Sequence, residues 1–170
     1  MKNSLLVLVF FLVIAGLFHF SSPNIVDLDS FYYIRQAWLY RTQGLFSVDF
    51  PWIQYSVIKI FSASLWYGFG ILLIPFTLFN DLALGIKIAG VLLTTLALFA
   101  FYWSVCKHGF RWKILWPLLF FFSAPNVLGQ LLMVRPQIIS LALIPILFSS
   151  LIFNNFLISF AASFCFVFSH

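Results

Sequence analysis

Two aspartates, Asp27 and Asp29, have the spacing best suited to chemistry in this sequence. In an extended backbone, side chains at positions i and i+2 point to the same side, so the two carboxylates would converge. Their repulsion is relieved when one is protonated, or when a metal ion or an arginine lies between them. Such a pair could bind a divalent cation, Mg or Mn, through hard oxygen ligands, or act as a general base on a hydroxyl. The alternative is that both are solvated loop acids and that Asp29 or Ser30 caps the next helix.

The residues after the acidic pair predict a helix that lies in the membrane interface. Phe31, Ile34 and Trp38 recur at i, i+3 and i+7, and arginines, glutamines and tyrosines fill other positions. The predicted helix covers residues 31–43 and stops before Gly44, a residue type common at helix ends. Tyrosine and tryptophan rings favour headgroup depth. A site at the start of this helix would therefore face lipid-linked phosphates.

The composition favours a membrane protein. The chain has 170 residues, of which 64% are hydrophobic and only 8% are charged, and its mean hydropathy is +1.09. Soluble domains carry about a quarter charged residues. Nine Lys and Arg against four acids give a net charge of +5, and these bases are scattered between apolar runs, which fits membrane orientation better than nucleic-acid binding. We predict an all-α fold, a polytopic transmembrane helical bundle with an interfacial amphipathic helix in its first outer loop.

The first apolar run, residues 4–20, is interpreted as a retained helix. A signal peptide is the alternative, but a cleavage site with small residues is absent, and Lys2 places the N-terminus in the cytoplasm. The last run is too short to cross a bilayer, so we expect the chain to be a fragment of a longer protein. A single N-terminal transmembrane portion, 1–170, would contain the first span, an outer loop at 21–62, and apolar segments at 64–79, 82–105, 114–133, 137–153 and 156–168.

The basic residues constrain the topology of these segments. Lys107, Arg111 and Lys113 form the densest basic cluster and should be cytoplasmic, like the N-terminus. An odd number of crossings must then separate the first outer loop from this cluster. Segment 64–79 contains two glycines and a proline, so it either spans or forms a re-entrant element. In the re-entrant case, Arg135 reaches the same side as the acidic pair.

Three further ionisable residues are predicted to be structural. Asp81 lies where two apolar runs meet and is expected to cap a helix. His19 and His108 have no His, Cys or acid nearby at a spacing typical of metal sites. We expect neither histidine to bind a metal.

Two motifs resemble the N-terminal part of GT-C fold glycosyltransferases. Residues 27–35 (DLDSFYYIR) place an acidic motif directly before an aromatic-rich interfacial helix, and residues 133–137 (MVRPQ) are similar to an Arg-Pro element found in several such families. The resemblance implies a polytopic membrane enzyme that takes sugars from polyprenyl-phosphate carriers, as oligosaccharyltransferase catalytic subunits and protein mannosyltransferases do. It covers most of this chain but only the front portion of such an enzyme.

The resemblance implies a reaction in which an acceptor hydroxyl or amide attacks the anomeric carbon of a lipid-phosphate sugar. Asp27 or Asp29 would hold the catalytic or metal-binding position. The expected partners are a polyprenyl-phosphate sugar donor and membrane lipids in a bacterial or archaeal cell membrane, without nucleic acid. Two alternatives stay open: an incomplete or inactive enzyme, and a non-catalytic polytopic membrane scaffold or assembly subunit. The candidate substrate-binding residues are Arg35, Tyr33, Lys59 and Arg135.

Overall fold

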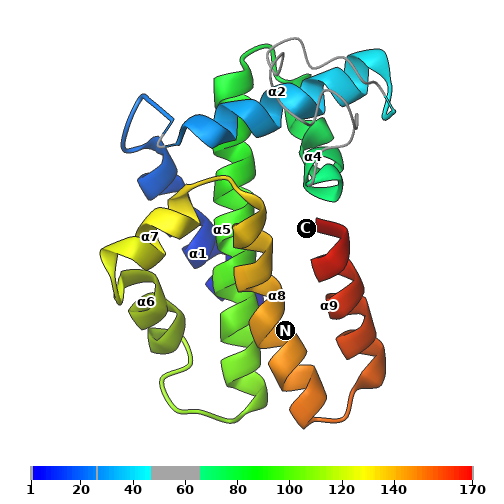
Figure 1. The fold of residues 1–170 in the computed structure, drawn as a ribbon. Coiled ribbons are helices and arrows are strands. Elements are labelled where there is room, and N and C mark those ends of the chain that lie inside the picture. Colours follow the sequence, from blue (N-terminus) through cyan, green and yellow to red (C-terminus); the bar gives the residue numbers. More distant parts are fainter. Residues whose placement is uncertain (1, 26, 47–65, 170) are drawn as a thin grey trace.

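The computed structural model describes residues 2–25, 27–46 and 66–169, and within these ranges the regular structure is helical (Figure 1). No strand occurs in the described ranges, which confirms the all-α prediction. In chain order the helices are α1 (Lys2–Phe20), α2 (Leu28–Gln43), α4 (Tyr67–Leu73), the 3-10 helix η1 (Ile74–Leu78), α5 (Leu82–Lys107), α6 (Leu115–Phe122), α7 (Pro125–Leu132), α8 (Pro136–Ile152) and α9 (Phe156–Ser169).

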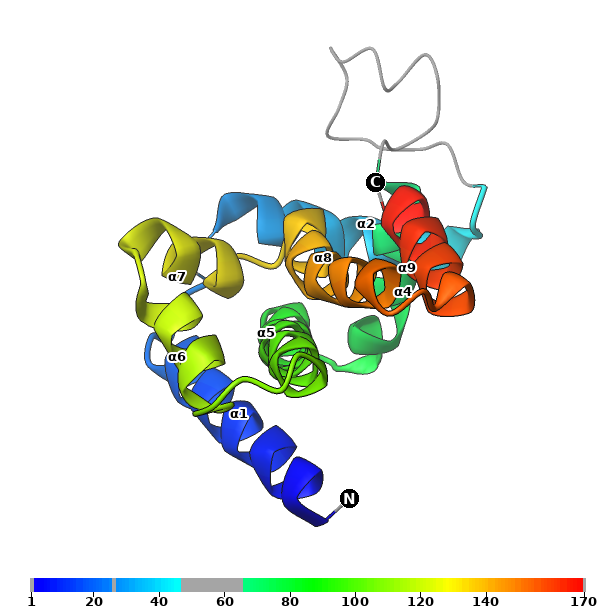
Figure 2. The same cartoon turned by 90° about the horizontal axis from the view of Figure 1, so that it is seen from below.

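Helix α5 is the centre of the molecule. It packs against α1 and α8, and α8 in turn packs against α9 (Figures 1 and 2). Close approach depends on Gly90, because a Cβ atom there would meet the ring of His19 on α1 and the side chain of Val134. The core between these helices consists of buried aliphatic and phenylalanine side chains such as Phe11 and Leu98. Helix α2 lies across the N-terminal end of α5 (Figure 1).

Helix α2 starts earlier than the sequence pattern indicates. Its N-cap residue is Asp27, with an extended backbone, whereas Asp29 lies inside the first turn. The predicted caps, Asp29 or Ser30, are therefore wrong, and the Asp27 side chain makes no capping hydrogen bond. The helix stops at Gly44 as predicted, with a φ of 105° that favours glycine.

The apolar face assigned to α2 is also partly wrong. Phe31 is 47% exposed, whereas Tyr33, Ile34, Ala37 and Tyr40 are buried. With the buried Gln36, the residues Tyr33, Ala37 and Tyr40 follow the i, i+3, i+4, i+7 pattern of a helix face. Tyrosine rings therefore supply much of the face by which α2 packs on the bundle.

The predicted continuous helix over residues 114–133 is broken. Helices α6 and α7 replace it and meet at an angle of 97°. Pro125 explains the break, because a proline disfavours helical backbone at the preceding residue. Ala124 is accordingly extended, with φ −154° and ψ 145°.

Segment 64–79 forms only short helical pieces where it is described. The joined helices α4 and η1 cover Tyr67–Leu78, which is too short for a crossing that needs about 20 residues. Glycine allows α4 to pack tightly: a Cβ on Gly70 would lie 2.7 Å from the ring of Tyr40, and one on Gly68 would meet the backbone of Phe168. This segment packs between α2 and α9.

One helix in the described part of the chain is long and apolar enough to cross a membrane. It is α5, with 26 residues. The bent pair α6 and α7 would add a second crossing if both halves formed one span. Helices α8 and α9 have 17 and 14 residues, at or below the length of about 17 to 25 residues that a crossing needs. The structure is thus compatible with a membrane protein, and the number of spans stays a prediction.

Candidate functional site

The centre of the candidate site is an ion pair between Arg135 and Asp27. The guanidinium donates from Nε to Oδ2 of Asp27 at 2.8 Å and from Nη2 to Oδ1 at 2.5 Å. The Asp27 side chain is 7% exposed and that of Arg135 is 28% exposed. Paired donation of this kind, with both partners charged, is the strongest class of side-chain hydrogen bond.

Asp29 joins the same arginine from the solvent side. One of its oxygens lies 3.1 Å from Nη2 of Arg135, and its side chain is 57% exposed. The two carboxylates therefore converge as predicted, and an arginine lies between them. The extended backbone assumed for both acids holds only at Asp27, because Asp29 is helical. The convergence comes from Arg135, whose Nη2 contacts one carboxylate oxygen of each acid.

Two chain segments position these three side chains. The acids stand at the beginning of α2, and Arg135 is the N-cap residue of α8. Ser30 links the segments: its hydroxyl donates to Asp27 at 3.3 Å and accepts from the backbone N–H of Val134 at 3.2 Å. Sequence inspection missed this role, because a serine near a helix start carries no signal for a partner more than a hundred residues away.

Neighbouring groups shift the pKa values of three residues in the site. The hydrogen bond from Arg135 is the largest cause that holds the pKa of Asp27 below its ordinary value. The same bond raises the pKa of Arg135 further above its ordinary value. Burial, followed by the charge of Asp29, raises the pKa of Tyr33 to about 12. At neutral pH Asp27 is therefore ionised, Arg135 is charged and the phenol of Tyr33 is neutral.

The structure brings together only part of the predicted set. Tyr33 is buried beside the acids, with its ring against Phe69. Arg35 is not part of the cluster: its guanidinium lies 4.0 Å from the centre of the Trp38 ring, on the exposed side of α2. Lys59 lies outside the described residues. The core of the candidate site is thus Asp27, Asp29, Arg135 and Tyr33.

The arrangement does not suit a divalent cation. A metal would need the space between the two carboxylates, which the guanidinium of Arg135 already occupies. In the described ranges no group of three or more His, Cys, Asp or Glu side chains is placed to hold an ion. Metal binding by Asp27 and Asp29 therefore stays a prediction from the sequence.

A second polar network holds α1, α5 and α7 beside the site. His19 lies 3.0 Å from the hydroxyl of Thr94, which donates to the carbonyl of Leu131 at 2.6 Å. His19 is buried. Lys87 donates to the carbonyls of Ser22 and Pro23 at 2.6 and 2.8 Å, and so fixes the chain between α1 and α2. A lysine within a predicted span was the available signal for this contact.

The other residues predicted to be structural have identified partners. Asp81 caps α5 by accepting a hydrogen bond from the N–H of Ala83 at 2.8 Å, which confirms the predicted cap. His108 lies 3.3 Å from the hydroxyl of Ser149 and packs against the ring of Phe153.

A hollow lined by amide groups opens next to the beginning of α8. Its volume is about 380 Å³. Asn126 and Gln130 of α7 and Gln137 of α8 supply side-chain amides, and Gln137 follows Arg135 by two positions. Amides can both donate and accept hydrogen bonds, so this surface could recognise hydroxyl groups.

No protein-family model, curated protein or solved structure matches this chain.

Proposed function

We propose that this chain is an integral-membrane glycosyltransferase of the GT-C type, or the N-terminal portion of one, that takes its sugar from a polyprenyl phosphate. The main support is the pairing of Arg135 with Asp27 beside an exposed Asp29. This places a cation and an accessible carboxylate together at one end of an apolar helical bundle. A lipid-linked phosphate and an acceptor hydroxyl need those two groups.

The outer surface of the bundle supports insertion into a bilayer. Large apolar side chains cover the outside of α9 and of α1. Soluble monomers rarely expose contiguous apolar patches of more than a few hundred Å². A lipid-facing surface explains this arrangement, and the protein would then be polytopic, with α1 and α5 among its spans. The exposed residues on these two helices include Leu5, Leu6, Val9, Val13, Leu17, Phe156, Leu157, Phe160, Phe164 and Val167.

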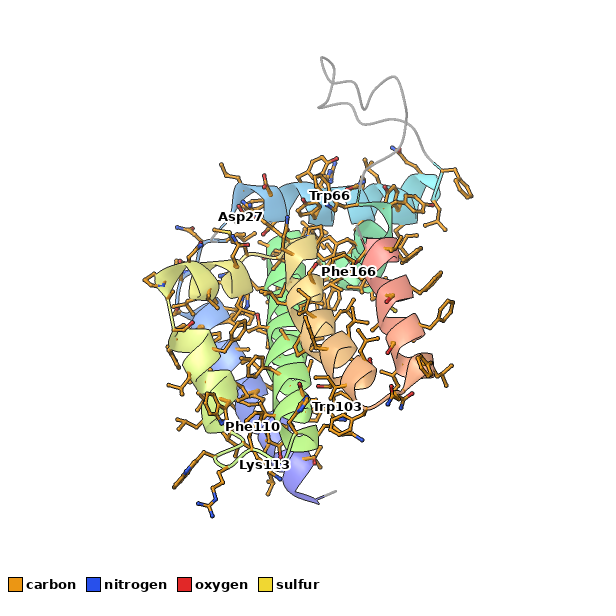
Figure 3. The ribbon with its side chains drawn as sticks, turned by 60° about the horizontal axis from the view of Figure 1, so that its bottom comes forward. Asp27, Trp66, Trp103, Phe110, Lys113 and Phe166 are labelled. Carbon is orange, nitrogen blue, oxygen red and sulfur yellow. The ribbon has the colours of Figure 1, made fainter. Side chains whose placement is uncertain are left out.

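The distribution of charge gives the orientation that we propose. Lys113 and Phe110 lie at one end of the bundle and Asp27 lies at the other (Figure 3). Because basic loops remain in the cytoplasm, the end with Lys113 would be cytoplasmic and the acidic site would face outward. α5 is then the single crossing between the first outer loop and the basic cluster, provided that the segment before it does not cross.

In the proposed reaction, Asp29 acts on the acceptor. Its exposed carboxylate takes the proton of the acceptor hydroxyl or amide while the acceptor atom bonds to the anomeric carbon. The bond from that carbon to the phosphate oxygen breaks, and the lipid phosphate leaves with the bonding electrons. Arg135 offsets the charge on the leaving phosphate. Asp27 is a positioning residue, since it holds the guanidinium on two of its nitrogens.

The amide-lined hollow would serve the sugar in this scheme. Asn126, Gln130 and Gln137 offer donors and acceptors, and apolar residues that include Val127 and Leu141 also line the hollow. Polar groups of this kind within a membrane bundle are commonly functional.

A non-catalytic scaffold is the second candidate, and one observation favours it. Two carboxylates already surround Arg135, so the local charge of the three groups is negative and an incoming phosphate would be repelled. In a scaffold, the cluster would be a clamp that fastens the start of α2 to the start of α8.

A transfer assay separates the two candidates. Membranes containing the protein would be supplied with polyprenyl-phosphate mannose or glucose, and release of polyprenyl phosphate would be measured. We expect Asp29→Asn to abolish release without changing the amount of folded protein. Asp81→Asn is the matched control, because asparagine caps a helix as well as aspartate does. Equal release from wild type and Asp29→Asn, or none above empty membranes from wild type, would favour the scaffold.

The orientation has its own test. Single cysteines at Asn24 and at Lys107, in a chain whose Cys106 and Cys165 are replaced by serine, would be treated with a membrane-impermeant maleimide in intact cells. We expect labelling at position 24 only. Labelling at position 107 instead would place the acidic cluster in the cytoplasm and remove the glycosyltransferase proposal.

A further inference from the structure

The basic end of the bundle contains a hollow that the proposed reaction does not use. It has a volume of about 810 Å³ and forms where α1 meets the loop between α5 and α6. Val7 of α1 and Tyr102 of α5 line it, and loop residues 109–114 with Leu115 at the start of α6 complete it. This volume is within the range of about 300 to 1,000 Å³ typical of sites for organic ligands.

The loop presents two cations to this hollow. Arg111 and Lys113 both line it, on either side of Trp112. The loop is held by hydrogen bonds from the Trp116 indole to the Arg111 carbonyl at 3.1 Å, and from the N–H of Leu115 to the Trp112 carbonyl at 2.8 Å. Trp112 has a φ of 58° and an exposed side chain. A bulky residue rarely adopts this conformation.

No acid in the described part of the chain balances these cations. The described acids, Asp27, Asp29 and Asp81, stand at the beginnings of α2 and α5, whereas the hollow is lined by Tyr102 near the other end of α5. Figure 3 shows two of its lining residues, Phe110 and Lys113, at the end of the bundle opposite Asp27. The rest of the lining is mostly apolar and includes Phe110 and Leu115. The hollow thus combines two cations with apolar side chains.

We propose that this hollow binds an anionic phospholipid of the cytoplasmic leaflet. Arg111 and Lys113 would contact the phosphate, and the acyl chains would run along Val7, Phe110 and Leu115. A water-soluble anion would gain nothing from the apolar wall, and a lipid with a zwitterionic headgroup would gain less from the cations. This inference rests only on the membrane insertion contained in the proposed function, and not on sugar transfer.

Lipid retention tests the proposal. The detergent-purified protein would be titrated with phosphatidylglycerol and with phosphatidylcholine of the same acyl chains, and bound lipid would be counted by native mass spectrometry. A third titration would use glycerol 3-phosphate. We expect phosphatidylglycerol to bind most tightly, and Arg111→Gln or Lys113→Gln to weaken it about fivefold each, since one base near an anionic surface contributes on this scale.

Lys107→Gln is the matched control. Lys107 is an exposed base at the same end of α5 but does not line the hollow, so its replacement should leave the binding constant unchanged. Lys113→Arg should retain binding, because it keeps the charge. An equal loss in Lys107→Gln, equal binding of phosphatidylcholine, or equal binding of glycerol 3-phosphate would overturn the proposal. Sugar transfer does not enter this measurement, so its absence would leave the result unaffected.

Discussion

Arg135 donates two hydrogen bonds to the carboxylate of Asp27, a residue 108 positions earlier in the chain. This pair fastens the beginning of α8 to the beginning of α2. Asp29 lies on the same guanidinium but remains largely open to solvent. The two acids, although only two residues apart, therefore have different roles: one holds the arginine and the other is accessible.

Replacing the two aspartates should separate these roles. Asp27→Asn removes a buried charge that pairs with the partly buried side chain of Arg135, and we expect a loss of about 2 kcal/mol in the free energy of unfolding. Asp29→Asn changes an exposed ion pair and should cost only about 0.5 kcal/mol. Equilibrium unfolding in detergent micelles titrated with dodecyl sulfate measures both. Equal losses would show that the two carboxylates share the arginine evenly.

Low pH should weaken the ion pair between Asp27 and Arg135. Its pKa lies below the ordinary value of 3.8 because Arg135 stabilises the carboxylate. The stabilisation is therefore complete above that value and is lost as the pH falls through the lower pKa of the folded protein. Thermal unfolding followed by tryptophan fluorescence from pH 6 to pH 2 should show this decline. In Asp27→Asn the decline in stability should be smaller than in the wild type. A decline as large as that of the wild type would exclude Asp27 as its source.

The contact between α1 and α5 should be sensitive to one added methyl group. A Cβ at Gly90 would lie 2.9 Å from a methyl of Val134 and would strike the ring of His19. We expect Gly90→Ala to destabilise the protein by about 2 kcal/mol, a typical effect of overpacking. Gly16→Ala is the control, because nothing lies within 4 Å of a Cβ there and alanine favours helix by up to about 1 kcal/mol. Equal effects of the two substitutions on unfolding would contradict this packing.

Loss of the Thr94 hydroxyl should destabilise the protein more than loss of the hydroxyl of its neighbour, Thr95. Thr94 is buried, and its hydroxyl bonds the Leu131 carbonyl and His19 on other helices. Thr94→Val would leave those partners unsatisfied at a cost of about 2 kcal/mol. Thr95→Val removes only a bond to the carbonyl of Val91 in the same helix, so we expect about 0.5 kcal/mol or less. The unfolding free energies of the two variants provide the comparison, and a larger effect at position 95 would contradict the network.

The sequence by itself determined the helical class, most segment boundaries and the acidic pair as the place to examine. Apolar runs define helices through local hydrogen bonds and composition, and Gly44 and Asp81 mark ends by local backbone chemistry. The break at Ala124 could also have been foreseen, since Pro125 is a local signal. The resemblance to GT-C enzymes remains a proposal.

Only the tertiary structure decided which side chains meet. Ser30 bonds the backbone of Val134, Lys87 bonds the chain after α1, and Arg35 lies over Trp38 instead of the acids. Each contact depends on how helices pack, and packing is set by interactions between residues distant in the chain, for which spacing within one helix holds no information. For the same reason, only the packing of α8 beside α2 shows that Asp27 is the buried partner of Arg135 and that Asp29 is an exposed carboxylate.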